Sequence, residues 1–217
     1  IKQSNKQQIF FKQYLGNKLW NESESAKKIK YLSNKDKVEK EENTFFISTK
    51  NYHKLAWHPK TLWLGIGCER NTSSTFIEDC IKKLLLKYEI SILSVAGLAT
   101  VDIKKDEQAL INITKTKNWP IKFFKNEDLL KVEIPNPSKI VFNEIGTFSV
   151  AEAASLLACG KEGGQIVIEK NIFKHKDLSG RNLGAVTLAI SESKQQFAPE
   201  RGFVHVIGSG PGDLSYL

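Results

Sequence analysis

Residues 61–67, TLWLGIG, decide the fold class of this chain. The run is apolar, follows Pro59 and ends in two glycines, which is typical of a central strand that is buried on both faces. The segment 72–90 then predicts an amphipathic helix, with Thr75 and Glu78 at the spacing of a capping box. Its apolar residues recur three and four positions apart: Phe76, Ile77, Cys80, Ile81, Leu84, Leu85 and Tyr88. A buried strand followed by such a helix favours an α/β fold.

Strands and helices continue to alternate downstream of this pair. The residues around Val101 alternate in polarity as a strand does, and they predict a face that carries the polar side chains. A helix over about 106–117 and a strand over 121–124 follow. The last strands are expected at 165–169 and 185–190.

Two further helices are indicated by capping residues. Asn136, which precedes a proline, suits the N-cap of a helix that stops at Gly146. Ser149 and Glu152 have the spacing of a capping box, which opens an apolar helix that ends at Gly160.

These elements predict a single three-layer α/β domain over 61–193 with a mixed or mostly parallel sheet. Residues 1–60 are polar and charged, so we expect a poorly ordered lead-in, the end of an incomplete preceding region, with one strand near 44–48. Residues 194–202 are expected to be a linker. Residues 203–217 are expected to form the first strand and the glycine-rich loop of a truncated second domain.

The composition is that of a globular protein with a basic surface. Of 217 residues, 41% are hydrophobic, the net charge is +8, and no run of about 18 apolar residues predicts a membrane span, so we expect a cytoplasmic location. The lysines are spread along the chain, which favours a solvated surface over a nucleic-acid interface. Three cysteines and four histidines lie in no paired spacing, so we expect reduced thiols and no metal site.

The end of the chain carries a glycine-rich loop, GSGPGD, directly after an apolar stretch. Such glycines allow backbone amides to approach a ligand closely. Together with its strand, the loop resembles the opening of the precorrin methyltransferases, which implies S-adenosylmethionine as a cofactor. The residues that this resemblance assigns to the cofactor are Gly208, Gly210, Pro211, Gly212 and Asp213.

Four motifs follow one another between Trp57 and Ser193: LWLGIGCERNTSS, LATVDIKKDE, NPSKIVFNEIGTFSVAEAASLLACG and VTLAISES. This order resembles the carboxy-terminal domain of the CbiG family, the cobalt-precorrin-5A hydrolases of anaerobic cobalamin (vitamin B12) biosynthesis, and the similar CobE proteins. The resemblance implies a hydrolase that opens the ring-contraction lactone of a carboxylate-rich tetrapyrrole and releases acetaldehyde.

The same resemblance sets the expected cofactors and partners. It implies no cofactor for the hydrolase domain, because the cobalt is carried in the substrate, and it implies a fusion to a precorrin-3B C17-methyltransferase. The expected partners are the tetrapyrrole substrate and other cobalamin-pathway enzymes, with no nucleic acid and no membrane.

The end of the first strand is the first candidate for a substrate site. Gly65, Gly67, Cys68 and Arg70 lie there, and the carboxyl ends of strands form the usual crevice for ligands in an open α/β sheet. Arg70 is either a clamp for substrate carboxylates or a surface arginine paired with a nearby acid. Cys68 is either a nucleophile or a small packing residue.

A second candidate group is formed by Thr100, Asp102 and Lys104, with Glu107 just beyond them. These residues either place a base beside a cation, with Asp102 as a catalytic residue, or form a solvated strand face.

The third candidate is the start of the helix that begins at Ser149. Capping accounts for Ser149 and Glu152, but a helix N-terminus also binds anions, and Glu152 is the candidate general base. We expect this helix start and the end of the first strand to share one pocket.

Two other functions remain open. The domain could hold a corrin intermediate without hydrolysing it and pass it to the fused methyltransferase. Nucleic-acid binding would depend on charge alone, and its affinity would fall steeply with salt.

Overall fold

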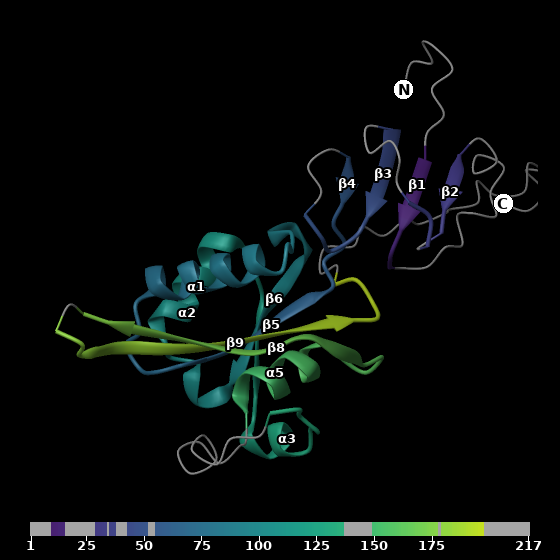
Figure 1. Cartoon of the computed structure of the whole chain (residues 1–217). Coiled ribbons are helices and arrows are strands. Elements are labelled where there is room, and N and C mark those ends of the chain that lie inside the picture. The colour runs from purple at the N-terminus through teal and green to yellow at the C-terminus, as the bar shows by residue number, and fades with distance from the viewer. Residues whose placement is uncertain are drawn as a thin grey trace, which may run out of the picture.

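A computed structural model describes residues 10–15, 29–33, 35–37, 43–51, 55–136, 149–177 and 179–197. These residues form an α/β structure with two sheets, as Figure 1 shows. In chain order the elements are β1 Phe10–Gln13, β2 Lys30–Leu32, β3 Thr44–Ile47, β4 Ala56–Trp57, β5 Leu62–Cys68, α1 Ser74–Lys87, the 3₁₀ turn η4 Ile92–Ser94, β6 Val95–Val101, the 3₁₀ turn η5 Asp102–Lys104, α2 Gln108–Lys117, β7 Ile121–Phe124, α3 Asn126–Leu130, α5 Val150–Ala158, β8 Gly164–Lys176 and β9 Asn182–Ser193.

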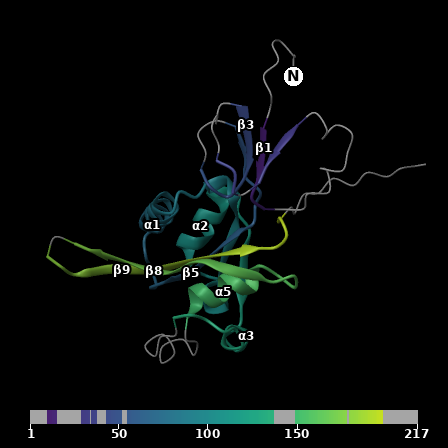
Figure 2. The same cartoon turned by 45° about the vertical axis from the view of Figure 1, so that its right-hand side comes forward.

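The larger sheet has five strands in the order β7-β6-β5-β9-β8. Strands β5, β6 and β7 are parallel, whereas β9 runs antiparallel to both β5 and β8. Figures 1 and 2 show that helices α1 and α2 cover one face of this sheet and that helices α3 and α5 cover the other. The predicted three-layer α/β domain with a mixed sheet is therefore confirmed.

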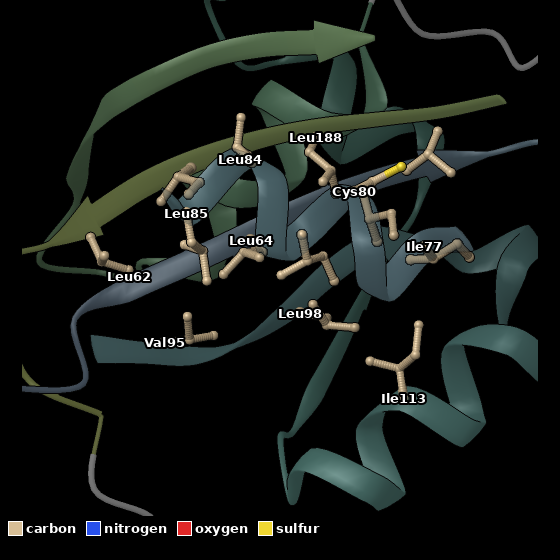
Figure 3. Packing of buried hydrophobic residues seen from close by; sticks show 14 of the residues in the cluster. Leu62, Leu64, Ile77, Cys80, Leu84, Leu85, Val95, Leu98, Ile113 and Leu188 are labelled. Carbon is tan, nitrogen blue, oxygen red and sulfur yellow. The ribbon is translucent and has the colours of Figure 1, made fainter. Parts of the chain in front are cut away.

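Two apolar clusters hold the layers together, one on each face of the sheet. The cluster under α1 and α2 contains the predicted helix stripe, including Cys80 and Leu84, packed on Leu64 (Figure 3). The cluster under α5 contains Trp63 and Ala153. Neighbouring residues of β5 point to opposite faces of the sheet, so this strand contributes side chains to both clusters. Full burial of a leucine or isoleucine side chain stabilises the fold by roughly 1.5–3 kcal/mol.

The structure moves two predicted boundaries. Ser73 rather than Thr75 caps α1, because its backbone is already outside the helix and its Oγ accepts a hydrogen bond from the Phe76 N–H. The strand predicted through residue 104 ends at Val101, and Asp102–Lys104 forms a 3₁₀ turn. The prediction that these polar side chains share one strand face is therefore wrong, because the chain already turns there toward α2.

The last two strands are much longer than predicted and form a projecting hairpin, which we call the β-arm (residues 173–177 and 179–185; Figures 1 and 2). Cys68, the last residue of β5, is level with Val186 of β9, so the β-arm extends past the carboxyl edge of the sheet. The His175 ring stacks on Phe76 of α1 with 4.6 Å between centroids. Helix α1 thus supports the arm from one side.

Strands β1 to β4 form a separate, fully parallel sheet in the order β2-β1-β3-β4. The strand near 44–48 is confirmed as β3, and the described residues before the larger domain contribute to this small sheet. Strands of two to four residues are too short to show an alternating pattern. Backbone hydrogen bonds of 2.8 Å from Ser91 to Thr49 and from Asn51 to Glu89 join this sheet to the larger domain.

Some predictions fall outside the described residues, namely the helix after Asn136 and the strand with its glycine-rich loop at 203–217. The expected linker begins as packed structure, because the Phe197 ring meets Trp63 edge-on at 5.1 Å. Among the described helices, none is long and apolar enough to cross a lipid bilayer.

Candidate functional site

A cluster of four charged side chains lies where β5 and β6 end, and we call it the carboxyl-edge cluster: Arg70, Lys104, Asp106 and Glu107. The Arg70 guanidinium is 2.5 Å from Asp106 Oδ1 and 3.8 Å from Glu107 Oε2. Lys104 Nζ lies 3.7 Å from the same Glu107 oxygen. The structure therefore brings together three residues that the sequence placed in two separate groups.

The inner half of this cluster is buried. The Lys104 side chain is 7% exposed and that of Glu107 is 5% exposed. Glu107 Oε1 also accepts a hydrogen bond of 3.2 Å from the backbone N–H of Asn71, which has a left-handed φ of 61°. An ion pair with so little solvent contact is costly to disrupt. The hydrogen bond from Asn71 then connects the loop after β5 to the start of α2.

The outer half of the cluster faces solvent. The Arg70 side chain is 51% exposed and that of Asp106 is 74% exposed. Arg70 also donates a 2.6 Å hydrogen bond to the Ile103 carbonyl. The hydrogen bond that Arg70 donates to Asp106 raises the pKa of Arg70 and lowers the pKa of Asp106. Arg70 is thus paired with an acid, yet its guanidinium keeps further N–H donors that a carboxylate could reach.

Cys68 ends β5 beside this cluster. Burial is the main cause that raises its pKa to about 11; Lys104 lowers this pKa by a smaller amount and Glu107 raises it further. A thiol with that pKa stays protonated at neutral pH, and thiolate is the nucleophilic form. This placement favours the packing role over the nucleophile.

The two glycines of β5 lie against helix α5 instead of a ligand-sized space. A Cβ on Gly65 would come within 1.7 Å of the Ala151 carbonyl oxygen, so this position must be glycine for α5 to pack here. A Cβ on Gly67 would be 3.8 Å from Val150, an ordinary contact. The strand end and the helix start do converge, as predicted, but at this point they touch directly.

Thr100 and Asp102 are placed differently from one another. Thr100 is fully buried, and its hydroxyl donates a 2.7 Å hydrogen bond to the Ile66 carbonyl, which joins β6 to β5. Asp102 is half-buried at the start of the 3₁₀ turn η5. Of the two, Asp102 alone could reach a substrate, although Thr100 helps to hold the strand ends in place.

Glu152 lies on the other face of the sheet in a second group of polar residues. Ser149 caps α5 as predicted and accepts a hydrogen bond from the Glu152 N–H. The Glu152 side chain is fully buried, and its Oε1 accepts hydrogen bonds from Asn136 Nδ2 at 3.0 Å and from the Lys170 N–H at 3.2 Å. Its Oε2 is buried without a hydrogen-bond partner among the described residues. Glu152 therefore does not complete the expected reciprocal capping box.

Some residues of these groups were not predicted from the sequence. Asp106 closes the carboxyl-edge cluster, and Lys170 and Asn136 hold Glu152, with Lys170 Nζ donating to the Asn136 carbonyl at 2.6 Å. The sequence offered a nearby acid as one alternative for Arg70, but it did not identify that acid as Asp106. No spacing in the sequence predicts that Glu152 accepts a hydrogen bond from a backbone N–H of a distant strand.

The fold and these two polar groups define a class of protein: a three-layer α/β domain whose charged and buried polar residues gather at the carboxyl edge of its parallel strands. Comparison with known families makes this specific. Residues 62–191 match the family described as "Cobalamin synthesis G C-terminus", and the chain belongs to this family.

Individual relatives agree with that assignment. The chain is 33% identical over 117 residues to the cobalt-precorrin-5A hydrolase of Priestia megaterium, which covers 54% of this chain and 31% of that protein. It is 28% identical over 117 residues to the protein CobE of a Sinorhizobium species, covering 52% of this chain and 75% of that protein. It thus spans about a third of the length of the hydrolase that it matches.

A solved structure also resembles the chain. The crystal structure of CobE, described as a protein from the cobalamin (vitamin B12) biosynthetic pathway, aligns with a TM-score of 0.52 and 25% sequence identity. The alignment covers 62% of this chain and 91% of CobE. The α/β domain is therefore a CbiG- and CobE-like domain of a cobalamin-synthesis family.

Proposed function

We propose that this domain binds cobalt-precorrin-5A across the carboxyl edge of its sheet and takes part in the hydrolysis that opens its lactone and releases acetaldehyde. The single observation that supports this proposal is that the family match spans the elements that build the edge, from β5 to β9. Relatives named as cobalt-precorrin-5A hydrolases match 117 and 116 residues of this chain.

The chemistry of the edge suits a large substrate with many carboxylates. Arg70 retains free N–H donors for a bidentate contact, and Lys104 adds a second, fixed positive charge behind it. Lys174 and Lys176 are exposed on the β-arm, which lies beside the end of β5. A macrocycle that lies across the strand ends would meet these cations along its rim.

In this proposal Glu152 is the general base and Asp102 is the second catalytic carboxylate. Glu152 Oε2 is buried and has no partner among the described residues, so it can accept a proton from a water molecule held at the start of α5. The N–H groups of the first turn of α5, which Ser149 caps, can stabilise an oxyanion that forms nearby.

A second function is favoured by a specific observation. The chain covers 75% of a CobE sequence but only 31% of the first hydrolase, so the domain corresponds to nearly a whole CobE protein. The alternative is therefore a carrier that binds a corrin intermediate without hydrolysing it.

One experiment separates the two functions. The chain is titrated with cobalt-precorrin-5A by absorption spectroscopy, and acetaldehyde is measured with an alcohol dehydrogenase assay. Acetaldehyde release that Glu152→Gln abolishes, with binding retained, supports the hydrolase; binding without release supports the carrier. Arg70→Gln should weaken binding in both cases, whereas Lys131→Gln, an exposed lysine paired with Asp128 at 3.2 Å, should not. The absence of both binding and release would refute both functions.

We also propose that residues 203–217 begin a precorrin methyltransferase domain that binds S-adenosylmethionine. The support is the sequence GSGPGD directly after an apolar stretch. A protein extended through the downstream coding sequence should bind S-adenosylmethionine in calorimetry, and Asp213→Ala should weaken that binding. An extended protein that folds but does not bind the cofactor would refute this part.

A further inference from the structure

A cleft of about 770 Å³ lies at the opposite edge of the larger sheet from the carboxyl-edge cluster. It is formed between the small amino-terminal sheet and the ends of the strands near Thr61 and Ser193. We call it the amino-edge cleft. Its volume lies in the range of about 300–1,000 Å³ that is typical of small-molecule sites, which often form between two structural units.

The two walls of the amino-edge cleft differ in chemistry. Ile47 and Trp57 of the small sheet and Leu15, which follows β1, supply apolar surface, and Trp57 is 51% exposed. Glu192 and Gln165 face them from the ends of β9 and β8. A large aromatic side chain left half exposed beside a cleft is a typical anchor for the apolar part of a ligand.

Glu192 is the central polar group of the cleft. Thr61 Oγ1 lies 3.5 Å from Glu192 Oε1, and the Gln165 side chain also hydrogen-bonds to this carboxyl. Among the described residues no cation lies within ion-pair distance of it, and burial raises its pKa. Lys194 also lines the cleft but is exposed. A partly buried carboxylate with only neutral donors gains most from a ligand that supplies a positive charge.

We propose that the amino-edge cleft binds a primary arylalkylamine, with its ammonium group on Glu192 and its ring against Trp57. The ammonium group donates hydrogen bonds to the carboxylate, and the ring covers apolar surface that Ile47 and Leu15 extend. The proposal concerns a second site and does not depend on the function of the carboxyl edge.

The experiment compares three ligands of one shape and different charge. Phenethylamine, 2-phenylethanol and 3-phenylpropanoate are titrated into the ¹⁵N-labelled chain at about 0.15 M salt, which screens its overall positive charge. The readout is the Trp57 indole N–H signal, assigned with Trp57→Phe. Phenethylamine should bind about tenfold or more tightly than the alcohol, and the propanoate should bind least, because a charge-assisted hydrogen bond is stronger than a neutral one.

Variants test which group carries the preference. Glu192→Gln should remove the advantage of the amine over the alcohol, whereas Glu133→Gln, an exposed glutamate outside the cleft, should leave it unchanged. Circular dichroism verifies that each variant is folded. Equal binding of amine and alcohol, an amine preference that survives Glu192→Gln, or no shift of the Trp57 signal at millimolar ligand would overturn the proposal.

Discussion

Gly65→Ala is the most direct test of how β5 and α5 pack. The added Cβ would lie 1.7 Å from the Ala151 carbonyl oxygen and 2.7 Å from the Ala151 carbonyl carbon. A weak C–H···O contact needs a carbon–oxygen distance of about 3.3 Å, so the helix must move by about 1.5 Å. Both atoms belong to the backbone of α5, and a side-chain rotation cannot relieve the clash.

The cost of this movement follows from what α5 buries. Val150, Ala153 and Ala154 pack in the second apolar cluster, and a gap of 0.5–1 Å already forfeits roughly a quarter to a half of each contact. Overpacking of a core costs typically about 1–3 kcal/mol, and the backbone clash places this variant at or above the top of that range. For a protein of this size about 3 kcal/mol lowers the melting temperature by roughly 6–12 °C.

The assay is thermal and urea unfolding followed by circular dichroism, with Gly67→Ala as the matched control on the same strand. The control adds a Cβ at 3.8 Å from Val150 and 3.9 Å from Thr187, so its stability should stay within about 0.5 kcal/mol of the original chain. If Gly65→Ala melts within about a degree of Gly67→Ala, the packing reason for this glycine is incorrect.

Three further predictions concern the residues around the carboxyl edge. Because burial raises the pKa of Cys68 from 9.0 to about 11, its thiolate at pH 8 should be about 100-fold scarcer than in the unfolded chain. Iodoacetamide should therefore modify Cys68 slowly in the folded protein. The stability that Cys68 contributes should be complete below pH 9 and should be lost as the pH rises toward 11, because the thiol ionises more readily in the unfolded chain. Lys104→Met should destabilise the fold by about 3 kcal/mol, because Glu107 keeps its burial and loses its nearest buried cation; adding Glu107→Leu should recover most of this loss in urea titrations. Replacing Lys174 and Lys176 with glutamine should weaken corrinoid binding and flatten its salt dependence, and an unchanged salt dependence would show that the β-arm does not contact the substrate.

The parts of the fold that the sequence predicted are those whose pattern is local. The apolar residues of β5 and α1 are the ones that pack in the core, so the spacing of these residues along the sequence predicts which face of each element is buried. The β-arm has polar residues on both strands, and one of its contacts with α1 is the stacking of His175 on Phe76. The small amino-terminal sheet is held by pairing between strands far apart in the chain, and no period of apolar residues encodes that pairing.

The candidate site was predictable only where its residues follow a strand directly. Arg70 comes just after β5, and the rule for strand ends placed it near the edge. Lys104 was expected on a strand face, and in the structure it follows the end of β6. The surroundings of Glu152 depend on Asn136 and Lys170, which are 16 and 18 residues away. Such contacts arise from the packing of α5 on the sheet, so the capping pattern suggested the wrong partner for this carboxylate.

The two edges of the larger sheet differ in charge, and this difference decides which edge suits a polycarboxylate. Arg70 is half exposed at the carboxyl edge, and the lysines of the β-arm lie beside it. The amino-edge cleft instead presents Glu192, a partly buried carboxyl whose pKa is raised by desolvation. A ligand with many carboxylates would add repulsion there and gain ion pairs at the carboxyl edge. Corrinoid binding that weakened in Arg70→Gln and stayed unchanged in Glu192→Gln would follow directly from this difference, and the reverse result would place the macrocycle in the cleft.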